Sequence, residues 1–178
     1  MKDKPLFTLI AVYLLGTLLF VKPDIIFNID LGKPVLNIKQ VGLKMPDRKR
    51  VALYNDQFRK VKSALGKPDF ISNNFSEGDE KTTVVLHYKN DKLYIKENVL
   101  DTYEIVDSRI AVGKKCGPTF KVGDHVSAAN AYIPIKYMQN YKLTADLILD
   151  DGSNTGHFIQ IQINPSDSKI KSIKVISH

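Results

Sequence analysis

The chain has 178 residues, of which 43% are hydrophobic and 25% are charged, and it contains one Cys and four His. This length suits one ordinary domain and excludes large multidomain machinery. The hydrophobic fraction excludes intrinsic disorder, and a single Cys excludes a disulfide scaffold and a multi-cysteine zinc or iron–sulfur site. We therefore expect a small folded domain with no cofactor and no metal.

Residues 1–23 are predicted to be a membrane anchor or uncleaved signal. Residues 6–21 carry no charge, and Lys2 and Lys4 precede them. This run is longer than most signal-peptide cores and falls short of the ~20 residues that span a bilayer comfortably. No small residues suited to signal peptidase follow it, and no Cys follows for lipid attachment, so an uncleaved anchor is favoured over a removed signal or a buried core helix. The short basic head predicts a single-pass protein, held by residues 5–22, with its C-terminal domain outside the cytoplasm, periplasmic or extracellular.

Residues 24–54 form a basic membrane-proximal segment. Nine Lys and Arg and two acidic residues fall within residues 33–62, whereas residues 63–178 carry fourteen of each sign, so the net charge of +7 arises beside the predicted anchor. Such a segment is either a solvated surface or a contact with anionic lipid head groups, worth about 1 kcal/mol per residue near the surface. No aromatic platform or basic recognition helix accompanies it, so no nucleic acid is expected. The expected membrane-surface contacts are Lys39, Lys44, Arg48, Lys49 and Arg50.

The remainder, residues 55–178, is predicted to be an α+β domain with two similar halves, 55–113 and 114–178. A helix begins at a cap on Asn55 or Asp56 and ends at Gly66, and a second, short helix covers residues 126–132. Three strands follow each helix, and residues 35–44 are an edge strand or an extended linker. The expected strands are 82–89, 92–97, 100–107, 143–149, 157–163 and 170–176. We expect one antiparallel sheet with both helices on one face, a two-layer sandwich that indicates an internal duplication in pattern.

Residues 61–69 read Val-Lys-Ser-Ala-Leu-Gly-Lys-Pro-Asp and precede a three-stranded meander with His87-Tyr88 in its first strand. This combination resembles the SmpA/OmlA outer-membrane-assembly lipoproteins. The helix-then-three-strands order, repeated over residues 55–176, resembles the tandem β-lactamase-inhibitor-protein-like (BLIP-like) fold. The chain departs from these families in having no lipidated Cys and no Trp. The resemblance implies an envelope protein that binds another protein with its sheet.

The search for catalytic motifs is largely negative. Two Ser-x-x-Lys matches, Ser166 to Lys169 and Ser168 to Lys171, fall in a predicted hairpin turn rather than at the start of a buried helix. Cys116 has cationic neighbours at Lys114 and Lys115, which favour a reactive thiolate, but no His is close in sequence. No catalytic residue is assigned, and an enzyme that uses Cys116 or His125 is only the least favoured alternative.

Alternation assigns each strand residue to one of two faces of the sheet. The face toward the helices is expected to carry Val84, Leu86, Leu93, Ile95, Ile105, Leu147, Leu149, Ile159, Ile161, Ile163, Ile173 and Val175. The opposite face mixes aromatic, amide and a few charged residues, which is typical either of a protein-binding surface or of an ordinary exposed sheet face. We expect Tyr94 and Phe158 to be binding anchors. The other expected binding residues on this face are His87, Lys96, Glu104, Gln160 and Gln162.

The sequence thus predicts a membrane-anchored, non-catalytic protein-binding module of the bacterial cell envelope, whose partner is another envelope protein. The alternative is an inhibitor or immunity protein that occludes an enzyme or toxin in the same compartment.

Overall fold

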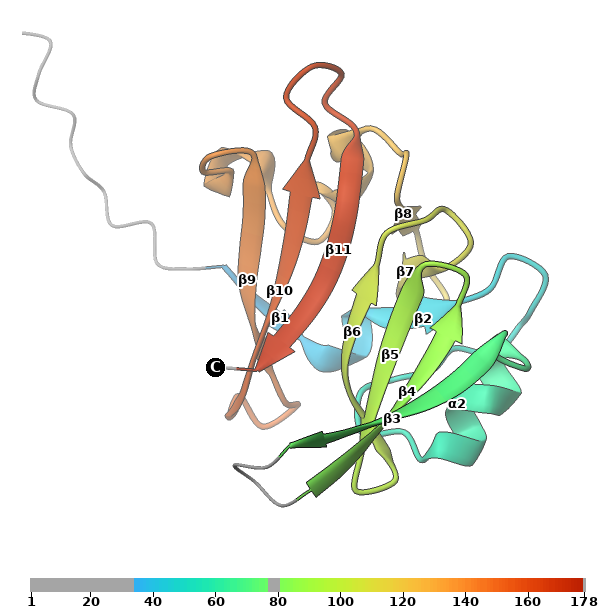
Figure 1. Cartoon of the computed structure of the whole chain (residues 1–178). Coiled ribbons are helices and arrows are strands. Elements are labelled where there is room, and N and C mark those ends of the chain that lie inside the picture. The colour runs from blue at the N-terminus through green and yellow to red at the C-terminus, as the bar shows by residue number, and fades with distance from the viewer. Residues whose placement is uncertain (1–33, 77–80, 178) are drawn as a thin grey trace, which may run out of the picture. The chain divides into compact units, whose positions relative to one another are not determined.

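The computed structural model describes residues 34–76 and 81–177, which form a mainly β domain (Figure 1). The larger sheet has eight strands in the order β1-β9-β10-β11-β6-β5-β4-β3. Neighbours are antiparallel except for β1 and β9, which are parallel, so the sheet is mixed rather than purely antiparallel as predicted. Its strands are β1 (Val35–Asn37), β3 (Phe70–Ser76), β4 (Lys81–Tyr88), β5 (Asp91–Lys96), β6 (Val99–Ile105), β9 (Lys142–Ile148), β10 (Asn154–Ile163) and β11 (Ile170–Ser177).

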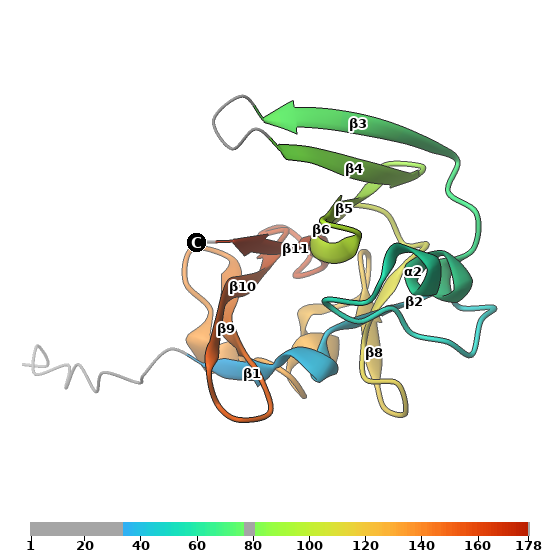
Figure 2. The ribbon, with the colours of Figure 1, turned by 90° about the horizontal axis from the view of Figure 1, so that it is seen from below.

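A second, three-stranded sheet lies against the larger one. It has the order β2-β7-β8 and consists of β2 (Gly42–Lys44), β7 (Ala111–Gly113) and β8 (Thr119–Lys121). The described residues also form one α-helix, α2 (Phe58–Leu65), and three 3-10 helices: η1 (Ile38–Gln40), η2 (Val126–Ala129) and η3 (Ile135–Tyr137). Figure 2 shows α2, β2 and β8 on one side of the curved larger sheet.

The larger sheet contains two meanders, β4-β5-β6 and β9-β10-β11, whose third strands pair with each other. All six of these strands lie close to their predicted positions. The prediction missed β3, β7 and β8. The expected single extended segment at residues 35–44 is interrupted by η1, so its two ends belong to different sheets.

The helices are shorter than predicted. The N-cap of α2 is Gln57, without a side-chain cap hydrogen bond, instead of Asn55 or Asp56. Asn55 has a φ of 61°, and Asp56 accepts from the Leu53 N–H, so both belong to the preceding turn. Gly66 ends α2 as expected, at a φ of 89° that favours glycine. The second helix extends only over η2, because the Asn130 side chain accepts from the Ile135 N–H and turns the chain before Pro134.

The two sheets and α2 enclose one hydrophobic core. Its members include Leu86, Leu93 and Ile161 of the larger sheet, Phe120 of the smaller sheet, and Leu65 of α2, all at most 1% exposed. Val126 and Ala129 of η2 belong to the same core, so the helical segments cover the same face of the larger sheet. We call this the inner face, and the opposite one the outer face.

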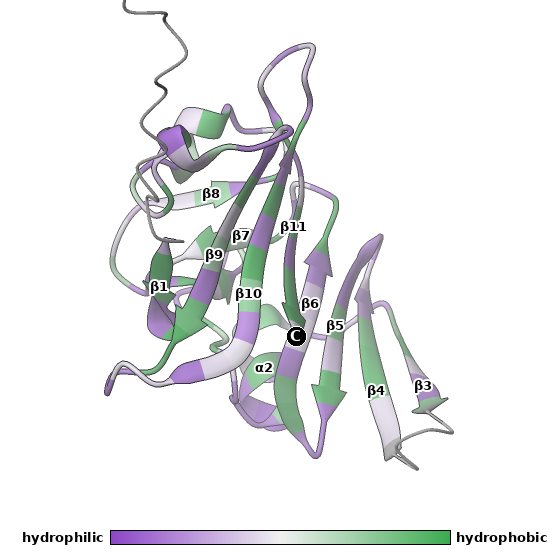
Figure 3. Cartoon of the chain, turned by 90° about the vertical axis from the view of Figure 1, so that its left-hand side faces the viewer, coloured by the Kyte–Doolittle hydropathy of each residue, from purple (hydrophilic) through white to green (hydrophobic). Residues whose placement is uncertain are grey.

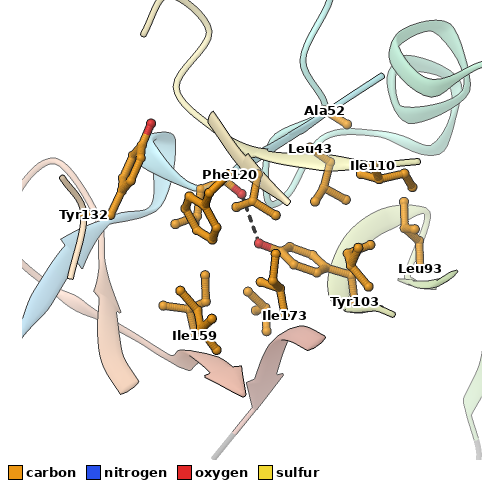
Figure 4. Close-up of a cluster of buried hydrophobic side chains, with 14 of the residues drawn as sticks. Leu43, Ala52, Leu93, Tyr103, Ile110, Phe120, Tyr132, Ile159 and Ile173 are labelled. Carbon is orange, nitrogen blue, oxygen red and sulfur yellow. Dashed lines mark hydrogen bonds between the residues drawn. The ribbon is translucent and has the colours of Figure 1, made fainter. Parts of the chain in front are cut away.

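Residues 34–54 of the basic segment are part of the domain. This part contributes β1 and β2, and its residues Leu36, Ile38, Val41, Leu43 and Ala52 are buried in the core. Tyr103 of β6 crosses the core and donates its hydroxyl proton to the Val41 carbonyl at 3.1 Å (Figure 4). The domain therefore extends well before residue 55.

No helix in the described ranges is both long enough and apolar enough to cross a membrane. The predicted anchor at residues 5–22 lies outside the described residues.

We predict that Tyr103→Phe lowers the free energy of unfolding by about 1–2 kcal/mol, because the buried Val41 carbonyl loses its donor while the ring stays in place. Urea unfolding of the full chain, followed by circular dichroism, measures this change. Tyr94→Phe is the matched control, since Tyr94 is on the outer face. Equal stability of the two variants would contradict the role of the Tyr103 hydrogen bond.

Candidate functional site

The outer face of the larger sheet carries the predicted binding residues. Figure 3 shows hydrophilic and hydrophobic stretches along the strands of this sheet. Each predicted binding residue is neither fully buried nor fully exposed, and none belongs to the core. They are His87, Tyr94, Lys96, Glu104, Phe158, Gln160 and Gln162. Alternation therefore assigned these side chains to the correct face, with exceptions among their neighbours: Val85 is 2% exposed on the outer face, and the inner-face prediction Leu149 is 39% exposed.

A polar row crosses the outer face from β9 to β3. Directly paired residues continue from strand to strand through seven strands. The row is Thr144, Gln160, Lys174, Glu104, Lys92, His87 and Phe70. The Lys174 ammonium and the Glu104 carboxylate form an ion pair at 2.5 Å in the middle of this row. Three predicted residues, His87, Glu104 and Gln160, thus share one line across the sheet.

A second, more apolar row of paired residues runs parallel to the polar row and is offset from it by two residues on each strand. Phe158 pairs with Ile176 on one side of the row, and Tyr94 pairs with Val85 and Thr102 on the other. The strands β10 and β5 that carry Phe158 and Tyr94 are three strand spacings apart, about 14 Å. The two predicted anchors therefore stand in one row without touching.

A pocket of about 450 Å³ lies in the outer face. Strands β6 and β11 pair directly at three positions, and the pair of Glu104 with Lys174 is the middle one. The ladder of backbone pairs does not continue beyond these three positions. Tyr94, Thr102, Glu104, Lys174 and Ile176 are among the lining residues. The pocket thus combines apolar side chains from one row with the ion pair of the other.

Asp101 reaches this pocket because of a bulge in β6. The register between β5 and β6 shifts at this position: Tyr94 faces Thr102 while Ile95 faces Leu100. Bulges commonly re-aim a side chain beside a functional site. The Asp101 Oδ1 lies 3.3 Å from Nε2 of the buried His157.

His157 connects Asp101 to Tyr54. Its Nδ1 lies 2.9 Å from the Thr155 carbonyl oxygen and 3.4 Å from the Tyr54 hydroxyl. Both ring nitrogens therefore lie within hydrogen-bond distance of oxygen atoms. Burial raises the pKa of the Tyr54 phenol, and the Asp101 carboxylate raises it further.

His87 has different surroundings. Phe70 of β3 stacks on its ring at 3.8 Å between centroids, and Ser72 Oγ is 2.9 Å from its Nε2. Burial lowers the pKa of the His87 imidazole, and the Lys92 ammonium lowers it further. Sequence reasoning missed Phe70 and Ser72 because it did not predict β3. It also missed Asp101, because alternation cannot show a bulge.

Lys96 and Gln162, two of the predicted binding residues, do not line the pocket that contains Tyr94 and Glu104. Lys96 pairs with Val99 where β5 turns into β6. Gln162 lines a separate hollow of about 440 Å³ beside the turn between β10 and β11.

The expected membrane-surface residues are divided between several elements. Lys39 of η1 is ion-paired with Asp150, and Lys44 ends β2. Arg48, Lys49 and Arg50 are exposed in the connection from β2 to α2, where Arg50 donates to Ser63 Oγ and Arg48 packs against Gly66.

The groups considered for catalysis do not come together. Cys116 is exposed in the turn between β7 and β8. The His125 Nδ1 is engaged by Ser127, its neighbour at the start of η2. Ser166, Ser168 and Lys169 lie in the predicted hairpin connection between β10 and β11, whereas Lys171 belongs to β11 itself. Within the described parts of the chain, no three His, Cys, Asp or Glu side chains are grouped so that they could hold a metal ion.

Asp91 has the most strongly raised carboxyl pKa among the described acids. It is fully buried at the start of β5, where its Oδ1 accepts from the Val106 and Asp107 N–H groups at 2.8 and 3.0 Å. Burial raises its pKa to about 6 despite these hydrogen bonds, and the Asp107 carboxylate adds to the increase. Its position indicates a structural role, since it fixes the chain where β6 ends.

Comparison of the chain with protein-family models, with curated proteins and with solved structures finds no match.

We predict that the wild-type chain loses stability relative to Asp91→Asn as the pH rises from about 4 to about 6. The raised pKa means that the native state holds the Asp91 proton in this range while the unfolded chain releases it, so the free energy of unfolding falls with rising pH. The amide introduced by the substitution retains an oxygen acceptor and does not titrate. Urea unfolding of both chains at several pH values measures the difference, and a constant difference from pH 4 to 7 would contradict this account.

Proposed function

We propose that the protein is a membrane-anchored, non-catalytic binding module of the bacterial cell envelope, which holds another protein against its outer sheet face. The observation that supports this most is the combination of the apolar row with the pocket. Phe158, Ile176 and Tyr94 offer partly exposed apolar area, and the pocket between them has a charged pair at its edge. Protein interfaces are typically built from such apolar anchors with polar groups around them.

The rigidity of this surface also favours binding. Its side chains project from paired strands whose other face is packed into the core. A partner therefore meets groups that are already positioned, which reduces the entropy lost on association.

The membrane part of the proposal depends on the sequence. Residues 6–21 carry no charge, and the exposed Arg48, Lys49 and Arg50 supply positive charge near the start of the domain. Anionic lipids would attract these three residues, whereas Lys39 is neutralised by Asp150.

An inhibitor or immunity protein is the second candidate. Its support is the resemblance of the sequence to the tandem β-lactamase-inhibitor-protein-like fold, together with a sheet in which two three-stranded meanders join through β6 and β11. Such a protein would use the same outer face but would block the activity of its partner.

We predict that Tyr94→Ala combined with Phe158→Ala weakens binding of the natural partner at least about tenfold, because buried aromatic anchors dominate interface energies. A photo-reactive phenylalanine analogue at position 94 or 158 of the full chain, in the producing cells, should capture the same protein. Binding of that protein to the alanine variant is then measured by surface plasmon resonance.

Tyr141→Ala combined with Leu149→Ala is the control, because both side chains are exposed and neither lines the outer pocket. The control should bind normally, and both double variants should keep the unfolding midpoint. Strong unfolding of the Tyr94 and Phe158 variant, or equal binding by all three chains, would refute the assigned surface. Loss of the partner's enzymatic activity on binding would favour the inhibitor.

A further inference from the structure

Strand β3 is an edge strand of the eight-stranded sheet formed by the described residues. It spans seven residues, Phe70–Ser76, and among the described strands β4 is its only neighbour, whereas the opposite edge strand β1 has three residues. Alternate N–H and C=O groups of an edge strand point away from the sheet and can pair with another strand. Proteins usually protect such edges with charged residues or proline, and β3 contains neither.

Apolar side chains accompany this open backbone. Ile71 and Phe75 are 47% and 64% exposed, and alternation places both on one face of β3 with Asn73 between them. Across β4 they face Leu86 and Thr82. Phe70, on the other face, is 55% exposed.

We propose that β3 pairs antiparallel with β3 of a second copy of this chain, about a two-fold axis at Asn73. The two eight-stranded sheets then become one continuous sheet. The proposal does not depend on the proposed function, because it uses a different surface.

The pattern of β3 favours a second copy as the occupant. Residues that pair directly across antiparallel strands point to the same face, so a symmetric register must be centred on a residue. With the two-fold axis at Asn73, all seven residues of β3 are paired. Ile71 of each copy then lies opposite Phe75 of the other copy. The remaining pairs are Ser72 with Asn74 and Phe70 with Ser76. No charged side chain within the strand opposes another, so nothing in β3 itself repels its copy.

The two-fold axis is perpendicular to the sheet, so the outer faces of the two copies lie on the same side of the continuous sheet. The paired strands are short, and the interface is therefore small and the dimer weak in dilute solution. Covalent trapping is the suitable measurement.

The test uses Asn73→Cys in the full chain with Cys116→Ser, which removes the exposed native thiol. Cβ atoms of directly opposed residues are about 4.5–5.5 Å apart, so a short thiol–thiol cross-linker should give mainly covalent dimer. Asn90→Cys, in the exposed turn between β4 and β5, is the matched control. Its copies would be at least three strand spacings apart, about 14 Å, and should give about tenfold less dimer.

Adding Ile71→Lys to the Asn73→Cys chain should lower the dimer yield about tenfold, since both apolar pairs are lost together. Circular dichroism verifies that each variant folds, which is expected because Ile71 and Asn73 are exposed. Equal yields from positions 73 and 90, or no effect of Ile71→Lys, would overturn the proposal. Capture of a different protein at position 73, without dimer, would also overturn it and would indicate strand addition by that protein.

Discussion

Three residue pairs between β6 and β11 join the two meanders into one sheet. Two of them, Ile105 with Ile173 and Tyr103 with Val175, face the core, and the third is the ion pair of Glu104 with Lys174 on the outer face. A shift of β11 by one residue along β6 would bring the Lys174 charge into the core and expose Ile173 and Val175. The same short contact leaves room for the pocket beyond it. Stability and the candidate binding surface therefore depend on one junction.

The bulge at Asp101 acts next to this junction. It turns a carboxylate toward the buried His157 of β10, which belongs to the other meander. The contact thus links β6 to β10 at the level where β6 and β11 no longer pair. The side of the pocket nearest Asp101 is consequently supported by a polar contact rather than by the ladder of backbone hydrogen bonds.

The meanders and α2 could be predicted from the sequence because their signals are strong. Alternation along strands of six to ten residues specifies β4, β5, β10 and β11, and Gly66 with Pro68 ends α2. Strands β7 and β8 have only three residues each, too few to show a period. Strand β3 has polar residues on both faces, so it looks like a loop. The expected second helix is limited to η2, because the Asn130 side chain accepts from the Ile135 N–H and turns the chain there, which helical spacing does not show.

The candidate site could be predicted only in part for the same reason. Alternation assigned Tyr94, Glu104, Phe158 and Gln160 to the outer face, but it could not show which strands are neighbours. The union of β6 with β11 brings Glu104 beside Lys174, a pairing over a separation of seventy residues. Phe70 and Asp101 depend on a missed strand and on a bulge, which residue types alone do not indicate.

The hydrogen bond from Tyr103 to Val41 limits how short a fragment of the chain can be and still form this fold. The acceptor belongs to the segment that enters before α2, and that segment also supplies a neighbour for β9 and a neighbour for β7. A fragment starting at residue 55 would leave a phenol in an apolar interior without an acceptor, and two strands would each lack a flank. The segment has the composition of a basic linker, but it supplies strands and core residues of the domain. Its deletion would therefore remove part of the fold.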